Sequence, residues 1–536
     1  MFGLIAPPFR NPIRPMRLIR PILFALAIAL TSFAHAATFD LATATIADIN
    51  AAFDKGALSS EKLTQLYLNR IEAYDKKGPE IKAFLYVNPN ALAEAKALDA
   101  ERKATGPRSP LHGVCVVLKD VFDTVDMPTT GGYVVLKGVK PTKDAFVVKR
   151  LREAGAVILG KLNQSDWYAP NEMVAASSMG GNTKNPFALD HIPGWSSAGT
   201  GAAMAAFFGT VGLGSETGFS IRTPTSDSNL YGLATTSGLI SRDGQMWSYI
   251  TGERGGPMAR SVYDLVATLD VIAGFDDNDL WTANSLGKMP PEKYVTFIKK
   301  DGLKGARVGV LKDAYGFKPA NDEGLKLAAA SIKVFEDNGA RVIYDLSLGI
   351  NLRDTLLKAF PRFERTAAIN HYLSRQGPNY PYHNAAELLL NHPEAPPRPE
   401  EAANLAHPID LDRDPQYRAF WEFKIGLRQA VIDLMDKYHL DALIYPHKLA
   451  GPLKIGPAKD PERQYEANQL SPITGLPAFI VPSGFTSDGL PIGFEILGRP
   501  WSEPTLIKLA SGFEGVTNNR RIPASTPPLP GEHFEY

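Results

Sequence analysis

The sequence has almost no cysteine, and this excludes two classes of protein. Its single cysteine, Cys115, cannot form an intramolecular disulfide or a zinc site built from several thiolates. The residues around it, Gly113 to Leu118, are small or apolar and predict a buried strand, so we expect Cys115 to be an inert core residue. The histidines include no H-E-x-x-H pair, and we therefore expect no metal site.

An excess of charge and long apolar segments are missing as well. Lys and Arg total 57, as do Asp and Glu, so no overall field attracts the chain to nucleic acid or to an anionic membrane. Beyond the N-terminal region no segment reaches about 18 consecutive apolar residues. We therefore expect no nucleic-acid partner and no stable membrane insertion of the mature chain.

The N-terminus, in contrast, has the pattern of an export signal. Several arginines precede an apolar run, Ile22 to Leu30, and Ala34-His35-Ala36 follows it. A basic region, a short apolar run and an A-x-A site are typical of a secretory signal peptide. We predict a signal peptide over residues 1–36 and an exported chain, periplasmic in a Gram-negative source and otherwise secreted. An uncleaved N-terminal anchor is the alternative.

The rest of the chain alternates helices with short apolar strands, a pattern that predicts an α/β fold with a sheet covered by helices on both faces. Ser59 and Ser60 begin a helix with one apolar face. Further helices are predicted over 146–154 and 324–337, and strands over 156–159, 307–311, 341–344, 442–445 and 478–481. A polar, proline-rich stretch, 391–415, predicts a long loop. We expect one domain over residues 38–530.

Two turns rich in serine and glycine stand out in the middle of the chain. One spans 194–201 and the other 214–222, and a helix of small residues is predicted between them over 202–208. Such turns can bring two serines and several backbone N–H groups together, because glycine permits close backbone approach. On composition alone, packing glycines and capping serines are the simpler explanation.

The order and spacing of these turns resemble the sequence pattern of the amidase signature family. The family pattern G-G-S-S-G-G-S, a small-residue helix and then G-T-D-x-G-G-S-I-R-x-P matches Gly194 to Thr200 and Gly214 to Pro224 without a gap. Upstream, Gly113 to Asp120 resembles the family's lysine strand, and 256–264 and 475–484 fit its downstream motifs. Five motifs in order form a specific pattern. The resemblance implies the family's large mixed sheet.

The resemblance also implies an activity, cleavage of a carboxylic amide C–N bond by a serine hydrolase without metal or cofactor. The family's catalytic lysine corresponds to Lys119, its bridging serine to Ser196 and its nucleophile to Ser220. In relatives a cis peptide bond precedes the bridging serine. The backbone N–H groups expected to form the oxyanion hole are those of Thr217, Gly218, Phe219 and Ser220.

General chemistry agrees with these roles. A serine hydroxyl attacks only when a base removes its proton, and a lysine is a base only when burial or a nearby positive charge lowers its pKa. Lys119 follows the apolar residues Val116 to Leu118, which favours burial. Most lysines at a strand end lie on the surface, so the assignment depends on the motif.

Three positions depart from the family pattern: Trp195, Ala198 and Phe219 stand where the family has glycine. Phe219 precedes the nucleophile, and a bulky residue resists positive φ, which places the oxyanion-hole geometry in question. One interpretation is a pocket wall suited to aromatic or hydrophobic acyl groups. The other is a ring turned into the core.

Several functional alternatives stay open at this point. An esterase or carbamate hydrolase would use the same acyl-enzyme chemistry, and a silent binding protein would keep the fold without the reaction. The export signal disfavours the family's amidotransferase branch, whose aminoacyl-tRNA chemistry is cytosolic. The expected partner is a small-molecule or peptide amide substrate, and a homodimer is left open. His447 could approach the pocket, but a lone histidine is more often structural.

Overall fold

The computed structural model describes residues 37–536 except 168–174, 360–361, 391, 393–396, 398, 407–408, 457–465 and 467. The predicted signal peptide, residues 1–36, lies outside the described residues. From Thr38 to Tyr536 the chain forms one compact unit. No helix within the described ranges is long and apolar enough to cross a membrane.

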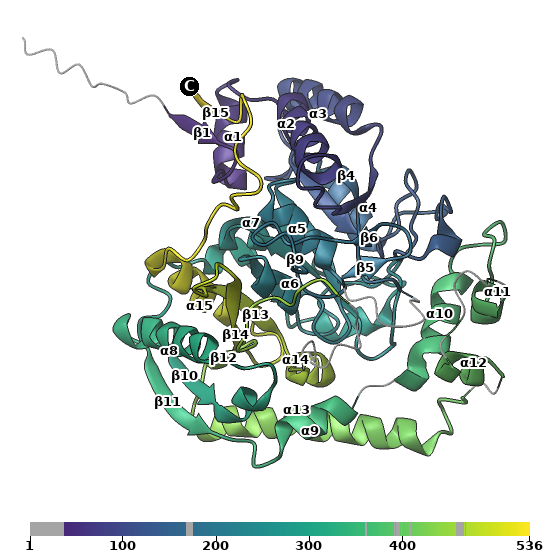
Figure 1. Cartoon of the computed structure of the whole chain (residues 1–536), viewed down its shortest axis with the longest axis vertical. Coiled ribbons are helices and arrows are strands. Elements are labelled where there is room, and N and C mark those ends of the chain that lie inside the picture. The colour runs from purple at the N-terminus through teal and green to yellow at the C-terminus, as the bar shows by residue number, and fades with distance from the viewer. Residues whose placement is uncertain are drawn as a thin grey trace, which may run out of the picture. The chain divides into compact units, whose positions relative to one another are not determined.

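An eleven-stranded mixed sheet forms the centre of this unit (Figure 1). β3 runs parallel to both β4 and β7, whereas β7 runs antiparallel to β9, so the predicted α/β fold with a large mixed sheet is confirmed. In order across the sheet, the strands are β11 (Arg341–Leu346), β10 (Arg307–Leu311), β12 (Ala442–Pro446), β14 (Pro491–Leu497), β13 (Ala478–Phe485), β8 (Tyr231–Ala234), β9 (Arg254–Ala259), β7 (Val211–Glu216), β3 (Cys115–Lys119), β4 (Val157–Leu162) and β2 (Phe84–Val87).

Helices flank the sheet (Figure 1), and two pairs of helices pack near β7 and β9 in its middle. α5 (Ala198–Ala205) and α6 (Arg222–Asp227) contact each other, while α7 (Val262–Ile272) contacts α15 (Glu503–Val516). The remaining helices are α1 (Ile46–Asp54), α2 (Ser60–Arg70), α3 (Ala91–Thr105), α4 (Phe146–Glu153), α8 (Asp322–Asp337), α9 (Leu352–Lys358), α10 (Arg365–Ser374), α11 (Ala385–Leu390), α12 (Pro399–Ala406), α13 (Pro415–Lys437) and α14 (Leu470–Thr474).

The helix of small residues begins earlier than the sequence predicts. α5 starts at Ala198, so Gly199 and Gly201 are helical and do not belong to the preceding turn. A Cβ at Gly199 would lie 2.2 Å from the Asn163 carbonyl oxygen, and one at Gly201 would lie 2.7 Å from the Ser228 hydroxyl. These glycines therefore allow the helix to pack closely against neighbouring segments.

The prediction of a long loop over 391–415 is wrong. α12 lies within this stretch, and α13 begins at its end with Pro415 in the first helical turn. The Asp414 carboxylate accepts hydrogen bonds from the N–H groups of Gln416 and Tyr417. Proline is well tolerated at the start of a helix because it lacks an N–H that would be unpaired there anyway. Pro415 therefore marks a helix start and does not belong to a loop.

The two ends of the compact unit meet in a separate small sheet. β1 (Thr38–Asp40) pairs antiparallel with β15 (His533–Glu535). The buried Arg70 on α2 holds the C-terminal segment beside it, because its guanidinium donates to the carboxylate of Glu532 and to the carbonyl of Thr526. Another two-stranded sheet joins β5 (Ala176–Ser177) and β6 (Gly181–Asn182).

Candidate active site

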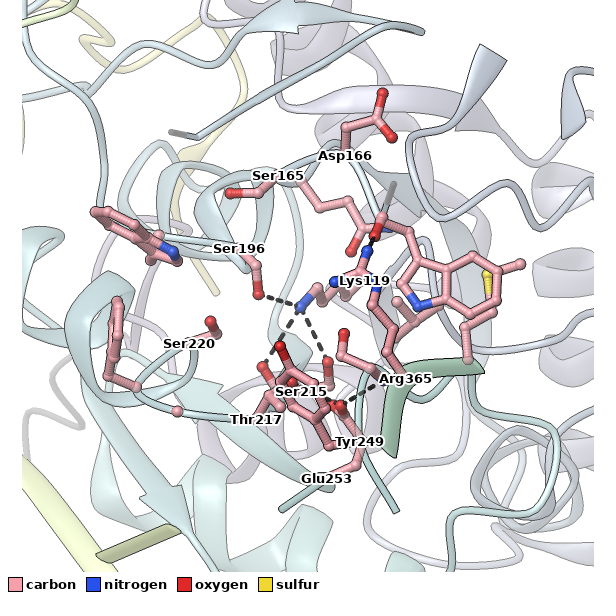
Figure 2. A pocket seen from close by; sticks show the side chains of 18 of the residues that line it. Lys119, Ser165, Asp166, Ser196, Ser215, Thr217, Ser220, Tyr249, Glu253 and Arg365 are labelled. Atoms are coloured by element: carbon pink, nitrogen blue, oxygen red, sulfur yellow. Dashed lines mark hydrogen bonds between the residues drawn. The ribbon is translucent and has the colours of Figure 1, made fainter. Parts of the chain in front are cut away.

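A cavity of about 390 Å³ lies where β3 and β7 end, and all the predicted catalytic residues line it (Figure 2). Lys119 is the last residue of β3, and Ser196 lies in the turn before α5. Ser220 lies in the turn between β7 and α6. Because β3 and β7 are parallel neighbours, their carboxyl ends bring these segments to one edge of the sheet.

Lys119 is buried among hydroxyl groups. Its side chain is 3% exposed, and its Nζ donates to the Ser196 Oγ at 2.6 Å and to the Ser215 Oγ at 2.9 Å. Burial lowers the pKa of Lys119 to about 8, although the negative charges of Glu253 and Glu216 oppose this change. About a tenth of Lys119 is therefore neutral at pH 7, and the neutral amine is the form that acts as a base.

Ser220 lies on the far side of Ser196 from the lysine. Figure 2 shows the Ser196 hydroxyl between the Lys119 ammonium group and the Ser220 hydroxyl. Ser220 is 5% exposed and lines the cavity. The hydrogen bonds of the described residues include one from Lys119 to Ser196 but none between the two serine hydroxyls. The structure thus brings the three residues together, but the hydroxyls of Ser196 and Ser220 are not hydrogen-bonded to each other.

The peptide bond before Ser196 differs from the expectation. Within the described ranges the single cis bond joins Lys318 and Pro319, so the bond between Trp195 and Ser196 is trans. The cis bond implied by the family resemblance is therefore absent in this structure.

The Ser220 turn is held by a buried arginine, Arg222. Its guanidinium donates to Glu216 at 2.9 Å, to Glu495 at 2.9 Å and to the Gly218 carbonyl at 2.7 Å. The Glu216 carboxylate also accepts from the backbone N–H of Ile221. Burial alone would lower the pKa of Arg222, but the two carboxylates outweigh it and raise the pKa. Arg222 is therefore a permanent cation that fixes the turn.

The charge network around Arg222 extends away from the cavity. Glu216 also binds Arg254 at 2.7 Å, and the pKa of Glu216 is lowered because the two arginines outweigh its burial. The ring nitrogens of His447 lie 2.8 Å from a Glu495 carboxylate oxygen and 2.8 Å from the Thr223 hydroxyl. His447 does not line the cavity, so it supports the network and is not part of the reacting site.

The four predicted oxyanion-hole residues, Thr217 to Ser220, form the turn itself and line the cavity. Among the described residues, the backbone N–H groups of Gly218 and Ser220 have no protein acceptor. Phe219 does not adopt positive φ, so replacing the family's glycine introduces no backbone strain there. Two N–H groups of this turn are thus available to an oxygen atom in the cavity.

Two of the residues that depart from the family pattern contact each other. The Trp195 and Phe219 rings pack edge to face with their centroids 5.0 Å apart, and both line the cavity. Phe219 is therefore part of the cavity wall and is not turned into the core. Further apolar and aromatic side chains complete the lining: Val121, Trp167, Met246, Tyr249 and Leu357.

Sequence reasoning missed several polar residues of the site, and Ser215 and Glu253 are the two that act on Lys119. Ser215 offers Lys119 its second hydroxyl. Glu253 is 4% exposed, lines the cavity and accepts from the Thr217 hydroxyl at 2.6 Å and from the Ser248 N–H at 3.1 Å. Burial raises the pKa of Glu253, while Lys119 opposes that rise. No motif of the sequence includes Glu253, and Lys119 and Thr217, which connect it to the catalytic residues, lie far from it along the chain.

Two expectations about reactive groups can be compared with the structure. Cys115 is buried in β3, and burial raises the pKa of its thiol to about 12, which agrees with an inert core residue. Among the residues that the structure describes, no group of three His, Cys, Asp or Glu side chains is arranged to hold a metal ion.

The chain is similar in sequence to known amidases. Residues 62–507 match the family described as Amidase. The chain is 32% identical to a "Probable amidase" of Arabidopsis thaliana over 91% of this chain and 92% of that protein. It is 30% identical to a glutamyl-tRNA(Gln) amidotransferase component of Acinetobacter baumannii over 89% of this chain and 97% of that protein.

Solved structures agree with the sequence comparison. The native peptide amidase from Stenotrophomonas maltophilia is 32% identical and superposes with a TM-score of 0.80, covering 90% of this chain and 98% of that one. A bacterial aryl acylamidase of the amidase signature enzymes superposes with a TM-score of 0.73, covering 88% and 96%. At 23% identity, this second likeness shows a shared fold only.

Proposed function

The chain belongs to the amidase signature family and is an amide-hydrolysing enzyme, and from this premise we propose that it reacts through an acyl-enzyme on Ser220. One observation carries the proposal. The buried Lys119, with a pKa lowered to about 8, contacts the Ser196 hydroxyl at 2.6 Å in the cavity that Ser220 lines. A lysine placed in this way can act as the base of a serine nucleophile.

The first half of the reaction forms the acyl-enzyme. Neutral Lys119 accepts the proton of Ser196, which accepts the proton of Ser220 as the Ser220 Oγ bonds to the carbonyl carbon. The resulting oxyanion accepts hydrogen bonds from the N–H groups of Gly218 and Ser220, and such a bond contributes about 3–4 kcal/mol in other serine hydrolases. The C–N bond breaks as Ser196 donates a proton to the leaving nitrogen and regains one from Lys119.

The second half releases the acid. A water molecule gives a proton through Ser196 to Lys119 as its oxygen bonds to the acyl carbon. The ester bond to Ser220 then breaks, and the proton returns to the Ser220 oxygen. Lys119 ends neutral, as it began, so the cycle needs no further proton donor.

The cavity wall favours amides with an apolar or aromatic acyl group. Trp195 and Phe219 form a paired aromatic wall next to the nucleophile, and Met246 and Tyr249 line the same cavity. Apolar side chains with a few placed polar groups are typical of sites that select the hydrophobic part of a small molecule. Peptide amides with a large apolar residue belong to this substrate class.

The reaction is tested without knowledge of the substrate. The purified chain is exposed to a fluorophosphonate, and its intact mass is measured beside that of Ser220→Ala. We expect one adduct on the wild type, mapped to the Ser220 peptide and absent from the variant. A folded wild type that stays unlabelled would contradict the mechanism and favour a silent binding protein. Matched aryl amides, esters and carbamates then show which bond is preferred.

We also propose that the chain is exported. The support is the run of arginines before the apolar segment Ile22 to Leu30 and the Ala34-His35-Ala36 site. An exported enzyme would be separated from aminoacyl-tRNA, the substrate class in the name of the relative from Acinetobacter baumannii. N-terminal sequencing of the protein from cell fractions tests this. A mature start near Ala37 outside the cytoplasm is expected, and a full-length cytoplasmic chain would overturn it.

A further inference from the structure

A second cavity, of about 360 Å³, shares no lining residue with the catalytic cavity. Three of the chain's six tryptophans line it, namely Trp281, Trp421 and Trp501. The Trp281 and Trp421 rings lie 5.9 Å apart, between centroids, at an angle of 41°. Its volume lies within the range of about 300–1,000 Å³ that is typical of small-molecule sites.

The charged side chains of this cavity are all basic. Lys288, Lys424 and Arg428 line it, and no Asp or Glu does. The Lys424 Nζ already donates to the backbone carbonyl of Ile473 at 2.6 Å. Lys288 is exposed at the rim. Burial lowers the pKa of Lys424 to about 7, so the positive charge of this cavity comes mainly from Arg428 and Lys288.

Besides the exposed Lys288, Arg428 is the charge in this cavity that lacks a protein partner among the described residues. It is half-buried on α13, and within the described part of the chain its guanidinium has no hydrogen bond and no carboxylate within salt-bridge distance. Burial lowers the pKa of Arg428, and no acidic group offsets this change. The buried Arg222 and Arg254, in contrast, each contact carboxylates. Because Arg428 is partly exposed at the cavity wall and no carboxylate of the described residues lies beside it, an anion that enters the cavity can bind its guanidinium.

We propose that this cavity binds a small aromatic carboxylate. The carboxylate contacts the Arg428 guanidinium, whose planar fork matches a carboxylate with two hydrogen bonds. The aromatic part packs against Trp281 and Trp421, since indole rings bind flat apolar surfaces well. An inorganic anion would satisfy the charge of Arg428 but leave the tryptophans in contact with water. The tryptophans therefore select an anion that carries an aromatic group. This site does not depend on the chemistry at Ser220.

Calorimetric titration of the full chain with 2-naphthoate tests the site. A charge-assisted hydrogen bond of this kind is worth at least about tenfold in affinity. We expect Arg428→Gln to weaken 2-naphthoate binding at least tenfold and Arg428→Lys to keep most of it. The matched control is Arg418→Gln, an exposed arginine on the same helix that does not line the cavity, and it should bind like the wild type.

Two further measurements keep the test decisive. The neutral analogue 2-naphthalenemethanol should bind the wild type at least about tenfold more weakly than 2-naphthoate does, because it offers Arg428 no negative charge. Ile425→Glu adds a negative charge at a lining position that is 61% exposed, so it should fold normally and also weaken binding. Absence of binding at millimolar 2-naphthoate, or equal binding by Arg428→Gln and Ile425→Glu to that of the wild type, would overturn the proposal.

Discussion

Two buried cations, Lys119 and Arg222, lie close to Ser220, and their partners give them opposite properties. Arg222 contacts two carboxylates, and its pKa is raised in spite of burial. Lys119 is equally buried, but its closest side-chain partners are the hydroxyls of Ser196 and Ser215, and its pKa falls to about 8. Burial alone therefore does not decide what a cation does. The charge of its partners decides whether it is a fixed clamp or a base.

The largest expected effect is on catalysis, from Lys119→Met. Loss of a general base typically costs 10²- to 10⁴-fold, and we expect about 10⁴-fold in kcat/KM, because among the described residues no other amine contacts Ser196. The free energy of unfolding should stay the same or rise, since an apolar side chain replaces a buried charge. Rates of amide hydrolysis and of fluorophosphonate labelling measure the first effect. More than a tenth of wild-type activity would remove Lys119 from the base role.

The next effect is on stability, from Arg222→Met. This variant leaves Glu216 and Glu495 with fewer positive partners in a buried setting, and breaking such a pair costs about 3–5 kcal/mol. Urea denaturation of Arg222→Met beside Lys119→Met gives the comparison directly. If the two variants unfold at the same urea concentration, Arg222 does not stabilise the fold more than Lys119 does, and the contrast between the two cations is wrong.

A smaller effect concerns pH. The neutral form of Lys119 is the base, so kcat/KM should rise with pH, with a midpoint near 8, and level off above it. Glu253→Gln removes a negative charge that favours the protonated lysine, so the midpoint should move to lower pH. Each unit of that shift raises the rate on the acid limb about tenfold. Glu422→Gln, exposed on α13, should leave the profile unchanged. A midpoint that stays or rises in Glu253→Gln would contradict the role of Glu253.

The smallest effect comes from the aromatic wall. An aromatic pair contributes about 0.5–1.5 kcal/mol beyond its buried area, so a double-mutant cycle of Trp195→Leu and Phe219→Leu should give a coupling of that size. The KM for an aryl-acyl amide should rise severalfold in each variant, whereas the KM for a small acetyl amide should change little. Equal changes for both substrates would show that the pair stabilises the turn and does not select the substrate.

Much of the sheet could be predicted from the sequence because several of its strands contain a short run of apolar residues. The strand expected over 307–311 coincides with β10, and that expected over 442–445 lies within β12. The secondary-structure predictions were wrong where one residue type occurs in two kinds of local structure. Gly199 provides close packing inside α5 where a turn is predicted, and Pro415 starts α13 where a loop is predicted. Propensity does not separate these uses, because the distinction lies in the neighbouring segments.

The residues of the two cavities likewise include some that the sequence could predict and some that it could not. Lys119, Ser196 and Ser220 could be found because they belong to motifs of fixed spacing. Glu253 and Arg428 belong to no motif, and their importance depends on which charges lie near them in space. The absence of a partner at Arg428 among the described residues is a property of the folded chain, and local sequence carries no signal for it.

The pairing of β1 with β15 has a consequence for the order of synthesis. A ribosome that has not yet finished the chain holds a protein without its last strand, and the small sheet cannot close. Until Glu532 emerges, Arg70 also lacks the carboxylate that neutralises it in the interior. A chain truncated before Glu532 would therefore carry an unpaired buried cation, which is costly, and an open strand edge, which favours aggregation.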